Sequence, residues 1–254
     1  MSKIVLPKFL CPKHETDLVR LGKKNDGGYA IPKKSFENSD FLYSFGLNDD
    51  FSFEEQFYAN SKSKIICYDH AVSYKFFIKN FLLGDFKSFI KFFDHIKFFN
   101  GNDKIHRKKY IAPVGTYNTY FKKEDIEDLN LILQNPTSKN LFFKIDIEGS
   151  EYRIFDQLIK YSQYMTGLVM EIHDCDLNII KIRHFIENIK LDLVHIHVNH
   201  SDFVSPSNFP RALELTFSPN EYNKILDDND KKFPIDLDQP NNPNFPDLPI
   251  EFVD

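Results

Sequence analysis

Several apolar segments of this sequence end in residues that can do chemistry. The segment LFFKIDIEGSEYRIF, residues 141 to 155, begins with three apolar residues and then carries Lys144, Asp146, Glu148 and Glu151. Carboxylates accept protons, bind divalent metals and hold the hydroxyl groups of ligands. A strand that served only for packing would not end in this much charge. The pattern therefore predicts that the end of this strand belongs to a site.

The elements that would position these residues alternate between short apolar strands and helical patterns. This alternation is typical of a layered α/β domain with a mostly parallel sheet. Strands are expected at 40–47, 63–70, 108–117, 140–149, 167–174, 191–200 and 212–219, and the last two could pair as an antiparallel edge. Helices are expected at 52–61 and at about 150–162.

In such a sheet, ligands bind beyond the carboxyl ends of the strands. Polar or small residues stand at that end of five of the expected strands, so we predict a site along one edge of the sheet. They are Phe45, Gly46, Asn48, Asp49, Asp50, Asp69, His70, Asp146, Glu148, Glu171, His173, Asp174, His195, His197, Asn199 and His200. Of these, Glu148, Glu171, His195 and Asn199 are predicted to bind the substrate.

The first two strand ends indicate a nucleotide cofactor. Asp69 follows the turn at Gly46 at the spacing, about 20 residues, at which an acidic residue holds the ribose of such a cofactor. The turn FGLNDD lacks G-x-G-x-x-G and offers carboxylates where a pyrophosphate would need bare helix N–H groups. Acidic groups there suit a cofactor with a cationic amino group, which favours S-adenosylmethionine over NAD or ATP.

Two further segments leave alternatives open. NDGGY, residues 25 to 29, is either a tight turn or a loop that closes over the cofactor. In VHIHVNH, alternation places His195 and His197 on one face with Asn199. Together with Asp146 and His173, these histidines predict either a general base or a site for Mg²⁺ or Mn²⁺ formed by Asp146, His173 and His197. His14, His95, His106 and His184 have no such neighbours and are expected to be surface or core residues.

Bulk properties set the limits. A chain of 254 residues is most simply a single domain, and its net charge of -5 argues against binding nucleic acid through phosphate neutralisation. The basic run KIHRKK, residues 104 to 109, is expected to be a solvated loop. Three cysteines outside any C-x-x-C suit a reducing cytoplasm. We find no signal peptide and no apolar run of about 18 residues, so we expect a cytoplasmic protein with no membrane span.

Two regions have unusual composition. Residues 72–100 are rich in Phe at helical spacings, which predicts a helical insertion that packs on the sheet, caps the site or forms a homodimer surface. Residues 228–254 are dense in Pro, Asn and Asp, which predicts an extended tail.

The motifs YSFGLNDDFSFEEQF, CYDH, FFKIDIEGSEYRIF and VMEIHD resemble the FkbM-type S-adenosylmethionine-dependent methyltransferases, a branch of the class I Rossmann-like enzymes. The most specific match is KIDIEGSE, and the likeness covers roughly residues 18 to 218. It implies a three-layer fold whose seven-stranded, mostly parallel sheet has an antiparallel last strand. It also implies methyl transfer, usually to a hydroxyl oxygen. The turn FGLNDD departs from the commoner family pattern.

The resemblance also implies roles for residues. Gly46 and Asp50 would line the methionine part of the cofactor, Asp69 its ribose, and Asp146 the junction with the acceptor, and His70 is also predicted to bind the cofactor. Similarity to a subgroup implies that the segments around Asp26, Gly27, Gly28, Tyr29, Phe45 and Ser52 frame the cofactor. We expect His173 or His197 to take the acceptor's proton while Asp146 orients the base or the acceptor.

Enzymes of this resemblance often methylate sugars, which implies an acceptor such as a nucleotide-linked or phosphorylated sugar precursor of a bacterial capsule or lipopolysaccharide. Two other classes stay open. One is an NAD-dependent nucleotide-sugar enzyme, and the other is a non-enzymatic scaffold with a degenerate Rossmann fold.

Overall fold

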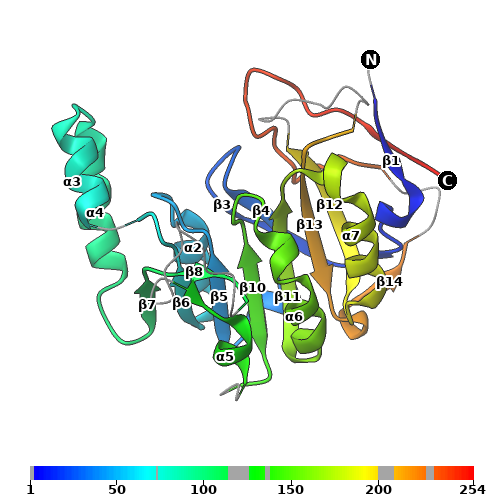
Figure 1. Cartoon of the computed structure of the whole chain (residues 1–254). Coiled ribbons are helices and arrows are strands. Elements are labelled where there is room, and N and C mark those ends of the chain that lie inside the picture. Colours follow the sequence, from blue (N-terminus) through cyan, green and yellow to red (C-terminus); the bar gives the residue numbers. More distant parts are fainter. Residues whose placement is uncertain (1–2, 73, 114–125, 135–137, 200–208, 227–231) are drawn as a thin grey trace.

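The computed structural model describes residues 3–72, 74–113, 126–134, 138–199, 209–226 and 232–254. A seven-stranded sheet with the order β12-β13-β11-β10-β5-β6-β7 forms its centre (Figure 1). The strands are β5 (Phe41–Phe45), β6 (Lys64–Tyr68), β7 (Lys104–Arg107), β10 (Leu141–Ile145), β11 (Met165–Ile172), β12 (Asp192–Asn199) and β13 (Ala212–Ser218). β13 runs antiparallel to both of its neighbours, and the other adjacent pairs are parallel.

Helices cover both faces of the sheet because the strands are apolar on both sides. On one face, α1 (Lys33–Glu37) and α2 (Ser52–Ser61) bury Phe36, Phe53 and Phe57 against sheet residues such as Phe142. On the other face, α5 (Leu129–Leu133), α6 (Phe155–Tyr161) and α7 (Cys175–Asn188) contribute Leu129, Leu158 and Phe185 to the larger core. The fold class expected from the sequence, a three-layer Rossmann-like methyltransferase fold with an antiparallel last strand, is confirmed.

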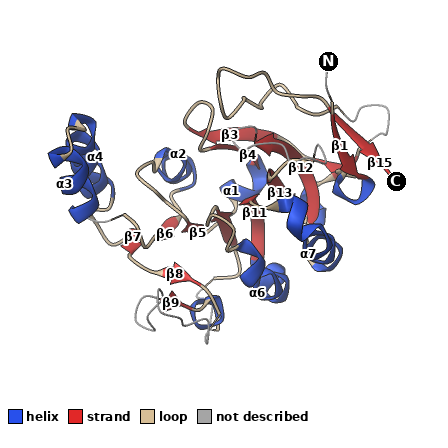
Figure 2. Ribbon diagram, turned by 45° about the horizontal axis from the view of Figure 1, so that its top comes forward, coloured by secondary structure: helices blue, strands red, loops and turns tan. Residues whose placement is uncertain are grey.

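A hairpin that the sequence analysis did not predict adds a second cover to the first face. β3 (Leu18–Gly22) and β4 (Gly28–Pro32) pair antiparallel, and the NDGGY segment covers the end of the turn between them and the first two residues of β4. Thr216 of β13 donates a hydrogen bond to the backbone oxygen of Ala30, which ties the hairpin to the sheet. Figure 2 shows the hairpin lying across the strands. NDGGY is therefore a turn that is also held close to the end of the sheet.

The third strand of the sheet lies earlier in the chain than predicted. The segment 108–117 is not the third strand of this sheet, as the sequence predicted, because that strand is β7 (Lys104–Arg107), inside the segment that we expected to be a solvated loop. β8 (Tyr110–Ile111) pairs instead with β9 (Ile126–Glu127) in a separate two-stranded sheet. An edge strand has only one neighbour and tolerates charged residues, so its sequence shows little apolar signal. Residues 114–117 lie outside the described residues.

The Phe-rich insertion forms two helices, α3 (Tyr74–Leu82) and α4 (Phe86–Phe98), which pack on each other and stand away from the sheet (Figures 1 and 2). Of the described tail residues, β15 (Ile250–Val253) pairs with β1 (Ile4–Pro7). The remaining elements are β2 (His14–Glu15), β14 (Lys224–Ile225) and the 3-10 helices Lys8–Leu10, Glu151–Arg153, Ser162–Tyr164 and Asn220–Tyr222. None of the helices in the described ranges has the length and apolarity needed to cross a membrane.

Candidate functional site

A cavity of about 510 Å³ opens beyond the carboxyl ends of β5, β6 and β10. This volume is in the range of small-molecule and cofactor sites. β5 stands at the point where the chain order reverses, with β6 on one side and β10 on the other, which is where ligands bind in open α/β sheets. The polar and aromatic lining residues are Lys23, Asp26, Tyr29, Asn48, Asp50, Phe53, Glu54, Tyr68, Asp69, His70, Lys109, Tyr110, Lys144, Asp146, Glu148 and Ser150.

The floor of this cavity depends on the absence of a side chain at Gly46. The N–H of Gly46 donates to the oxygen of Tyr68, and the N–H of Asp146 donates to the oxygen of Phe45. Gly46 has a φ of 80°, and a Cβ there would lie 1.5 Å from the backbone oxygen of Asp146. The ends of three strands therefore meet at a point that only glycine fits.

Asp69 organises two loops of the cavity. Its Oδ2 accepts the N–H groups of Leu47 and Asn48, and its Oδ1 accepts those of Ala71 and Val72. Burial by itself would raise the pKa of Asp69, but the four backbone hydrogen bonds outweigh it and lower the pKa. These bonds use about all the acceptor capacity of a carboxylate. The structure thus gives Asp69 a positioning role, whereas the sequence analysis expected it to hold the ribose.

Asp50 sits at the start of α2. Its Oδ1 accepts the N–H of Ser52, the first residue of the helix, and its Oδ2 lies 3.0 Å from Nζ of Lys23. Burial opposes the charged form, but the Lys23 and Ser52 hydrogen bonds lower the pKa of Asp50. A carboxylate therefore occupies the helix N-terminus that binds the pyrophosphate in dinucleotide enzymes.

The β3–β4 hairpin brings Tyr29 to the end of β10. The Tyr29 hydroxyl lies 3.1 Å from Oδ2 of Asp146, to which it donates, and 3.4 Å from Oε2 of Glu171. Tyr29 is almost completely buried. A β4 residue more than a hundred positions earlier in the chain thus holds the Asp146 carboxylate in one orientation.

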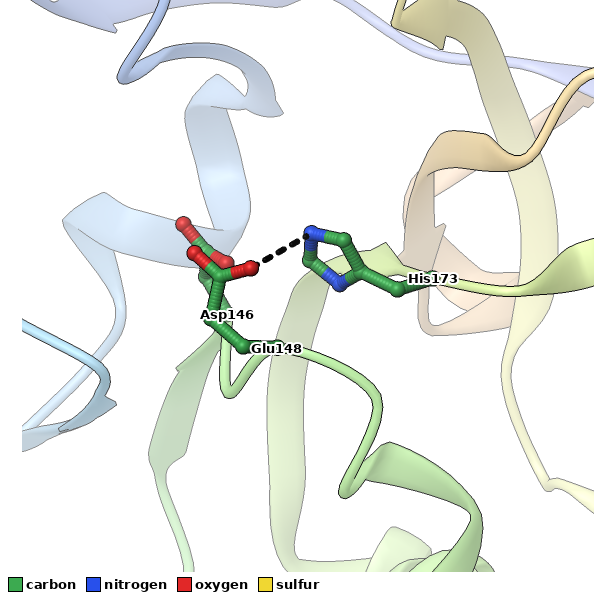
Figure 3. Close-up of side chains that lie close together, drawn as sticks. All are labelled: Asp146, Glu148 and His173. Carbon is green, nitrogen blue, oxygen red and sulfur yellow. Dashed lines mark ion pairs between the residues drawn. The ribbon is translucent and has the colours of Figure 1, made fainter. Parts of the chain in front are cut away.

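Asp146, Glu148 and His173 form a compact cluster (Figure 3). Each offers one ligand atom, and these atoms lie within 4.8 Å of one another. Nε2 of His173 is 3.5 Å from a carboxylate oxygen of Glu148 and 3.5 Å from Oε1 of Glu171. Glu148 has a φ of 53°, and Asn48 and Asp174 on neighbouring loops also have positive φ. Non-glycine residues in this strained region concentrate at functional sites.

Glu151 fixes the orientation of His173. This glutamate is fully buried, and its Oε1 accepts the N–H groups of Ile147 and Gly149 and lies 3.2 Å from Nδ1 of His173. Burial alone would lower the pKa of His173, but Glu151, Glu171 and Asp146 raise it to about 9. The raised pKa favours the imidazolium form of His173, which suits this side chain less well to accept a proton.

The pKa values of the neighbouring carboxylates Asp146 and Glu171 are raised as well. Burial raises the pKa of Asp146, and Lys144 and His173 offset only part of that rise. Burial also raises the pKa of Glu171 well above its ordinary value, and the charges of Asp146 and Glu214 add to the rise. A carboxylate with a raised pKa is a better proton acceptor near neutral pH. Asp146, which lines the cavity, is thus the base that this geometry favours.

His197 does not join this cluster, which corrects its assignment as a catalytic residue and metal ligand. Its strand register pairs it with Glu214, which pairs in turn with Glu171, so His197 lies two strands, about 10 Å, from Glu171. Its Nδ1 is 3.2 Å from Glu214 and its Nε2 is 3.1 Å from Asp247. Both ring nitrogens are therefore used by buried or half-buried carboxylates.

His195 is corrected in the same way. It faces the same side as His197, as the alternation predicted, but it pairs with Thr216 at the depth of Val169. There its Nε2 lies 3.1 Å from Asp238 of the tail. Asn199 is nearer the site, because its Nδ2 donates to Oε1 of Glu171 at 2.6 Å. Of the four predicted acceptor-binding residues, Glu148 alone lines the cavity, and Glu171 and Asn199 support the cluster beside it.

The buried His197 pair predicts how stability depends on pH. Burial would lower the pKa of His197, but Glu214 and Asp247 raise it to about 10. Because the folded pKa exceeds the unfolded value of about 6.5, this stabilisation is complete below pH ~6.5 and is lost as the pH rises toward 10. We expect His197→Gln to lower the free energy of unfolding by about 3–5 kcal/mol near pH 6.5, as breaking a buried ion pair does. Near pH 10 the loss should be smaller. Urea denaturation of both proteins across this range measures the difference.

His184→Gln is the matched control, because His184 is exposed on α7 and its removal should change stability little at any pH. If the difference in free energy of unfolding between wild type and His197→Gln stays constant with pH, His197 is not stabilised in its protonated form.

Eight of the eleven residues predicted to bind cofactor line the cavity, namely Asp26, Gly27, Tyr29, Gly46, Asp50, Asp69, His70 and Asp146. Gly28, Phe45 and Ser52 are not among the lining residues that the structure describes. Phe45 lies in the apolar core, and Ser52 is the first residue of α2. That Gly28, Phe45 and Ser52 frame the cofactor stays a prediction, and only residues near them in the chain line the cavity.

Sequence reasoning missed Glu54 and Tyr110, and it assigned no role in the cavity to Lys144. Glu54 and Lys144 are buried, and Glu54 accepts a hydrogen bond from Ser44 while Lys144 donates to the oxygen of Gly46. Tyr110 stacks on His70 with ring centroids 3.6 Å apart. The sequence does carry a signal for Lys144, because a lysine inside an apolar strand needs a buried partner. Nothing local marks Glu54 or Tyr110.

The comparisons with known proteins give only distant likenesses. No family model and no curated protein matches the chain. The chain is similar to M. capricolum TrmK in complex with S-adenosyl-homocysteine, at 11% identity and a TM-score of 0.41 over 76% of this chain and 67% of that one.

Two other solved structures show the same degree of likeness. A precorrin-6y C5,15-methyltransferase from Geobacter metallireducens matches at 10% identity and a TM-score of 0.38, over 72% of this chain and 81% of that one. The Methanococcus jannaschii fibrillarin pre-rRNA processing protein matches at 8% identity and a TM-score of 0.38, over 80% of this chain and 82% of that one. Likenesses this low carry no argument, so the fold assignment rests on the strand order.

Proposed function

We propose that the protein is an S-adenosylmethionine-dependent O-methyltransferase. The observation that carries this proposal is the placement of carboxylates around the cavity at the sheet's switch point. Asp50 closes the N-terminus of α2, and Asp146 and Glu148 line the opposite wall. A cofactor with a cationic amino group and a sulfonium is attracted to such a site, whereas the pyrophosphate of NAD is repelled.

An unsatisfied buried oxygen supports the same cofactor. Glu54 lines the cavity, its Oε1 is bonded to Ser44, and its Oε2 has no hydrogen-bond partner among the described residues. Burial raises the pKa of Glu54, which marks a carboxylate that lacks sufficient positive charge nearby. An amino group of the cofactor would supply that charge and a hydrogen bond.

The other end of the cavity suits a purine base. His70 and Tyr110 form a stacked pair on the wall beyond β6, next to the loops that Asp69 holds. Flat aromatic side chains favour flat ligands through stacking. Asn48 and His70 line the cavity beside Asp69 and are the residues that would bind the ribose. Asp69 positions their loops and would not contact the ribose itself.

The residues of this chain would act mainly by positioning and by accepting a proton. S-adenosylmethionine supplies an electrophilic methyl group, and its transfer leaves S-adenosylhomocysteine and a methyl ether. Tyr29 holds Asp146 at the junction of the cavity with the cluster, where the raised pKa of Asp146 suits it to take the proton of an acceptor hydroxyl. His173, held by Glu151, keeps the carboxylates together with its positive charge. Fixing the acceptor in line with the methyl group supplies much of the rate.

A divalent cation is the second arrangement that the cluster fits. Two carboxylates and an imidazole whose other nitrogen is held by a carboxylate form a donor set for Mg²⁺ or Mn²⁺. Asp146, Glu148 and His173 would hold the ion, in place of the predicted set that contained His197. Bound there, it would lower the pKa of the acceptor hydroxyl.

For the acceptor, we propose a sugar or small phosphorylated precursor of a bacterial surface polysaccharide, handled in the cytoplasm. The FkbM resemblance supports this choice. Lys23 and Lys109 line the mouth of the cavity, where they suit a phosphate or nucleotide-linked group. The net charge of -5 and the acidic cavity weigh against a nucleic-acid acceptor.

Calorimetric titration of the protein with S-adenosylhomocysteine and with NAD tests the cofactor. We expect S-adenosylhomocysteine to bind in the micromolar range and NAD to produce no saturable heat, because carboxylates fill the pyrophosphate position. Binding of NAD alone would favour the nucleotide-sugar enzyme, and binding of neither would favour the non-enzymatic scaffold.

A further inference from the structure

The α3–α4 hairpin carries an exposed apolar surface that the proposed activity does not use. On α4, Phe86, Phe89, Ile90, Phe93 and Ile96 are exposed, and the first four follow the i, i+3, i+4, i+7 spacing of one helix face. At the tip, Leu82 and Leu83 are 77% and 75% exposed. Isolated exposed apolar residues are ordinary, but a continuous stripe of large ones marks an interaction surface.

The hairpin is a defined structure rather than a loose segment. Phe77 is buried between the helices and lies 6.0 Å from Phe92 and 5.6 Å from His95 between ring centroids. The base is attached to the body where Phe98 stacks on Phe51 at 5.3 Å. Phe86, Phe89 and Phe93 thus stay exposed although the hairpin already has its own apolar interior.

The position of the hairpin excludes a capping role in this structure. None of its described residues lines the cavity, and both views show the helices projecting beyond the β7 edge, away from the centre of the sheet (Figures 1 and 2). Leu82 and Leu83 form the tip of the hairpin, where α3 ends and the turn to α4 begins. Whatever covers the stripe must therefore approach from outside the domain.

Charge identifies the kind of surface that fits. Residues 74–98 contain five lysines and two aspartates, a formal net charge of +3 in a chain whose net charge is -5. Lys79 and Lys87 are exposed on either side of the tip. Phe and Leu on one face with lysines beside them are typical of helices that lie in the interface of an anionic membrane. A second copy of the hairpin would instead bring two positive surfaces together.

We propose that the α3–α4 hairpin docks the protein on the surface of an anionic lipid bilayer. The apolar stripe enters the boundary between headgroups and acyl chains, while the lysine stems lie along the apolar surface and their ammonium groups reach the lipid phosphates. The hairpin lies on the membrane and does not span it. This inference is independent of the proposed activity.

Sedimentation of the full chain with vesicles tests the proposal. We expect binding to phosphatidylcholine vesicles that contain phosphatidylglycerol, with affinity that falls as salt is raised, and at least about 10-fold weaker binding to phosphatidylcholine alone. The triple variant Leu82→Ser, Leu83→Ser, Phe86→Ser should lose binding by about 10-fold or more, because it removes the apolar tip. Lys79→Gln with Lys87→Gln should also weaken binding by about 10-fold or more.

Two matched controls separate the hairpin from general effects. Leu177→Ser, Ile180→Ser and Ile225→Ser remove equally exposed apolar residues elsewhere, and Lys33→Gln with Lys34→Gln makes the same charge change on α1. Both should bind as wild type does. Unchanged binding by the tip variant, or equal binding to neutral vesicles, would overturn the proposal. So would a dimer in sedimentation velocity that the tip variant converts to monomer.

Discussion

Gly46→Ala is expected to abolish measurable S-adenosylhomocysteine binding while the domain still folds. The new Cβ would lie 1.5 Å from the backbone oxygen of Asp146, and the φ of 80° disfavours any side chain. Relief of this overlap requires the ends of β5 and β10 to separate at the floor of the cavity. We expect a loss of about 3 kcal/mol in the free energy of unfolding and at least about 100-fold in affinity. Calorimetry and urea denaturation measure the two effects.

Gly101→Ala is the matched control for this variant. Gly101 also has a positive φ, of 126°, but nothing lies within 4 Å of the position that its Cβ would take. The cost should therefore be confined to backbone strain, about 1–2 kcal/mol, with cofactor affinity unchanged. If both alanine variants bind S-adenosylhomocysteine equally well, the close approach of Gly46 to Asp146 does not shape the cofactor site.

Asp146→Asn is expected to lower kcat for methyl transfer by about 100-fold to 10,000-fold, the range that general base catalysis contributes. The amide keeps the size of the side chain and can still accept the Tyr29 hydrogen bond, but it cannot take a proton. Affinity for S-adenosylhomocysteine should change by only a few fold. Release of S-adenosylhomocysteine in the presence of a panel of nucleotide sugars and sugar phosphates provides the assay. An Asp146→Asn enzyme with wild-type kcat would rule out this base.

Glu148→Gln and a chelator distinguish the base from the metal arrangement at the same cluster. If Asp146 acts as the base alone, Glu148→Gln should lose less than about 10-fold in kcat and EDTA should have no effect. If the cluster holds Mg²⁺ or Mn²⁺, Glu148→Gln and EDTA should both reduce activity strongly, and added metal should restore only the chelated wild type. His173→Gln belongs to the same series, because it removes the third donor.

The central architecture could be predicted from the sequence because its signals are local. The strands at 40–47, 63–70, 140–149, 167–174, 191–200 and 212–219 were expected near their observed positions, since buried strands are short apolar runs bounded by turns. The third strand failed for a physical reason. As an edge strand it needs one partner only, so Lys104–Arg107 could be charged and escape notice.

The site could be predicted only where a residue able to do chemistry stands at the carboxyl end of a predicted strand. Asp146, Glu148 and His173 were expected along one edge because the carboxyl ends of adjacent parallel strands share it, although the predicted metal set contained His197 in place of Glu148. The β12 histidines share the predicted face, but alternation gives neither depth nor lateral distance. His195 lies at the depth of Val169, and His197 lies two strands from Glu171. Their partners Asp238 and Asp247 lie about 40 and 50 residues further along the chain in a tail with no periodic signal.

The sequence by itself thus determined six of the seven strands of the sheet, the polar residues at their carboxyl ends and the acidic character of the cavity. Periodicity and charge are properties of neighbouring residues, so the sequence shows them directly. Only the tertiary structure decided what each charged group does. Asp69 binds four backbone N–H groups, and Glu151 turns His173 toward Glu148. It also decided that the hairpin of Phe residues projects outward. These outcomes depend on distances between segments that are far apart in the chain, and no local pattern encodes them.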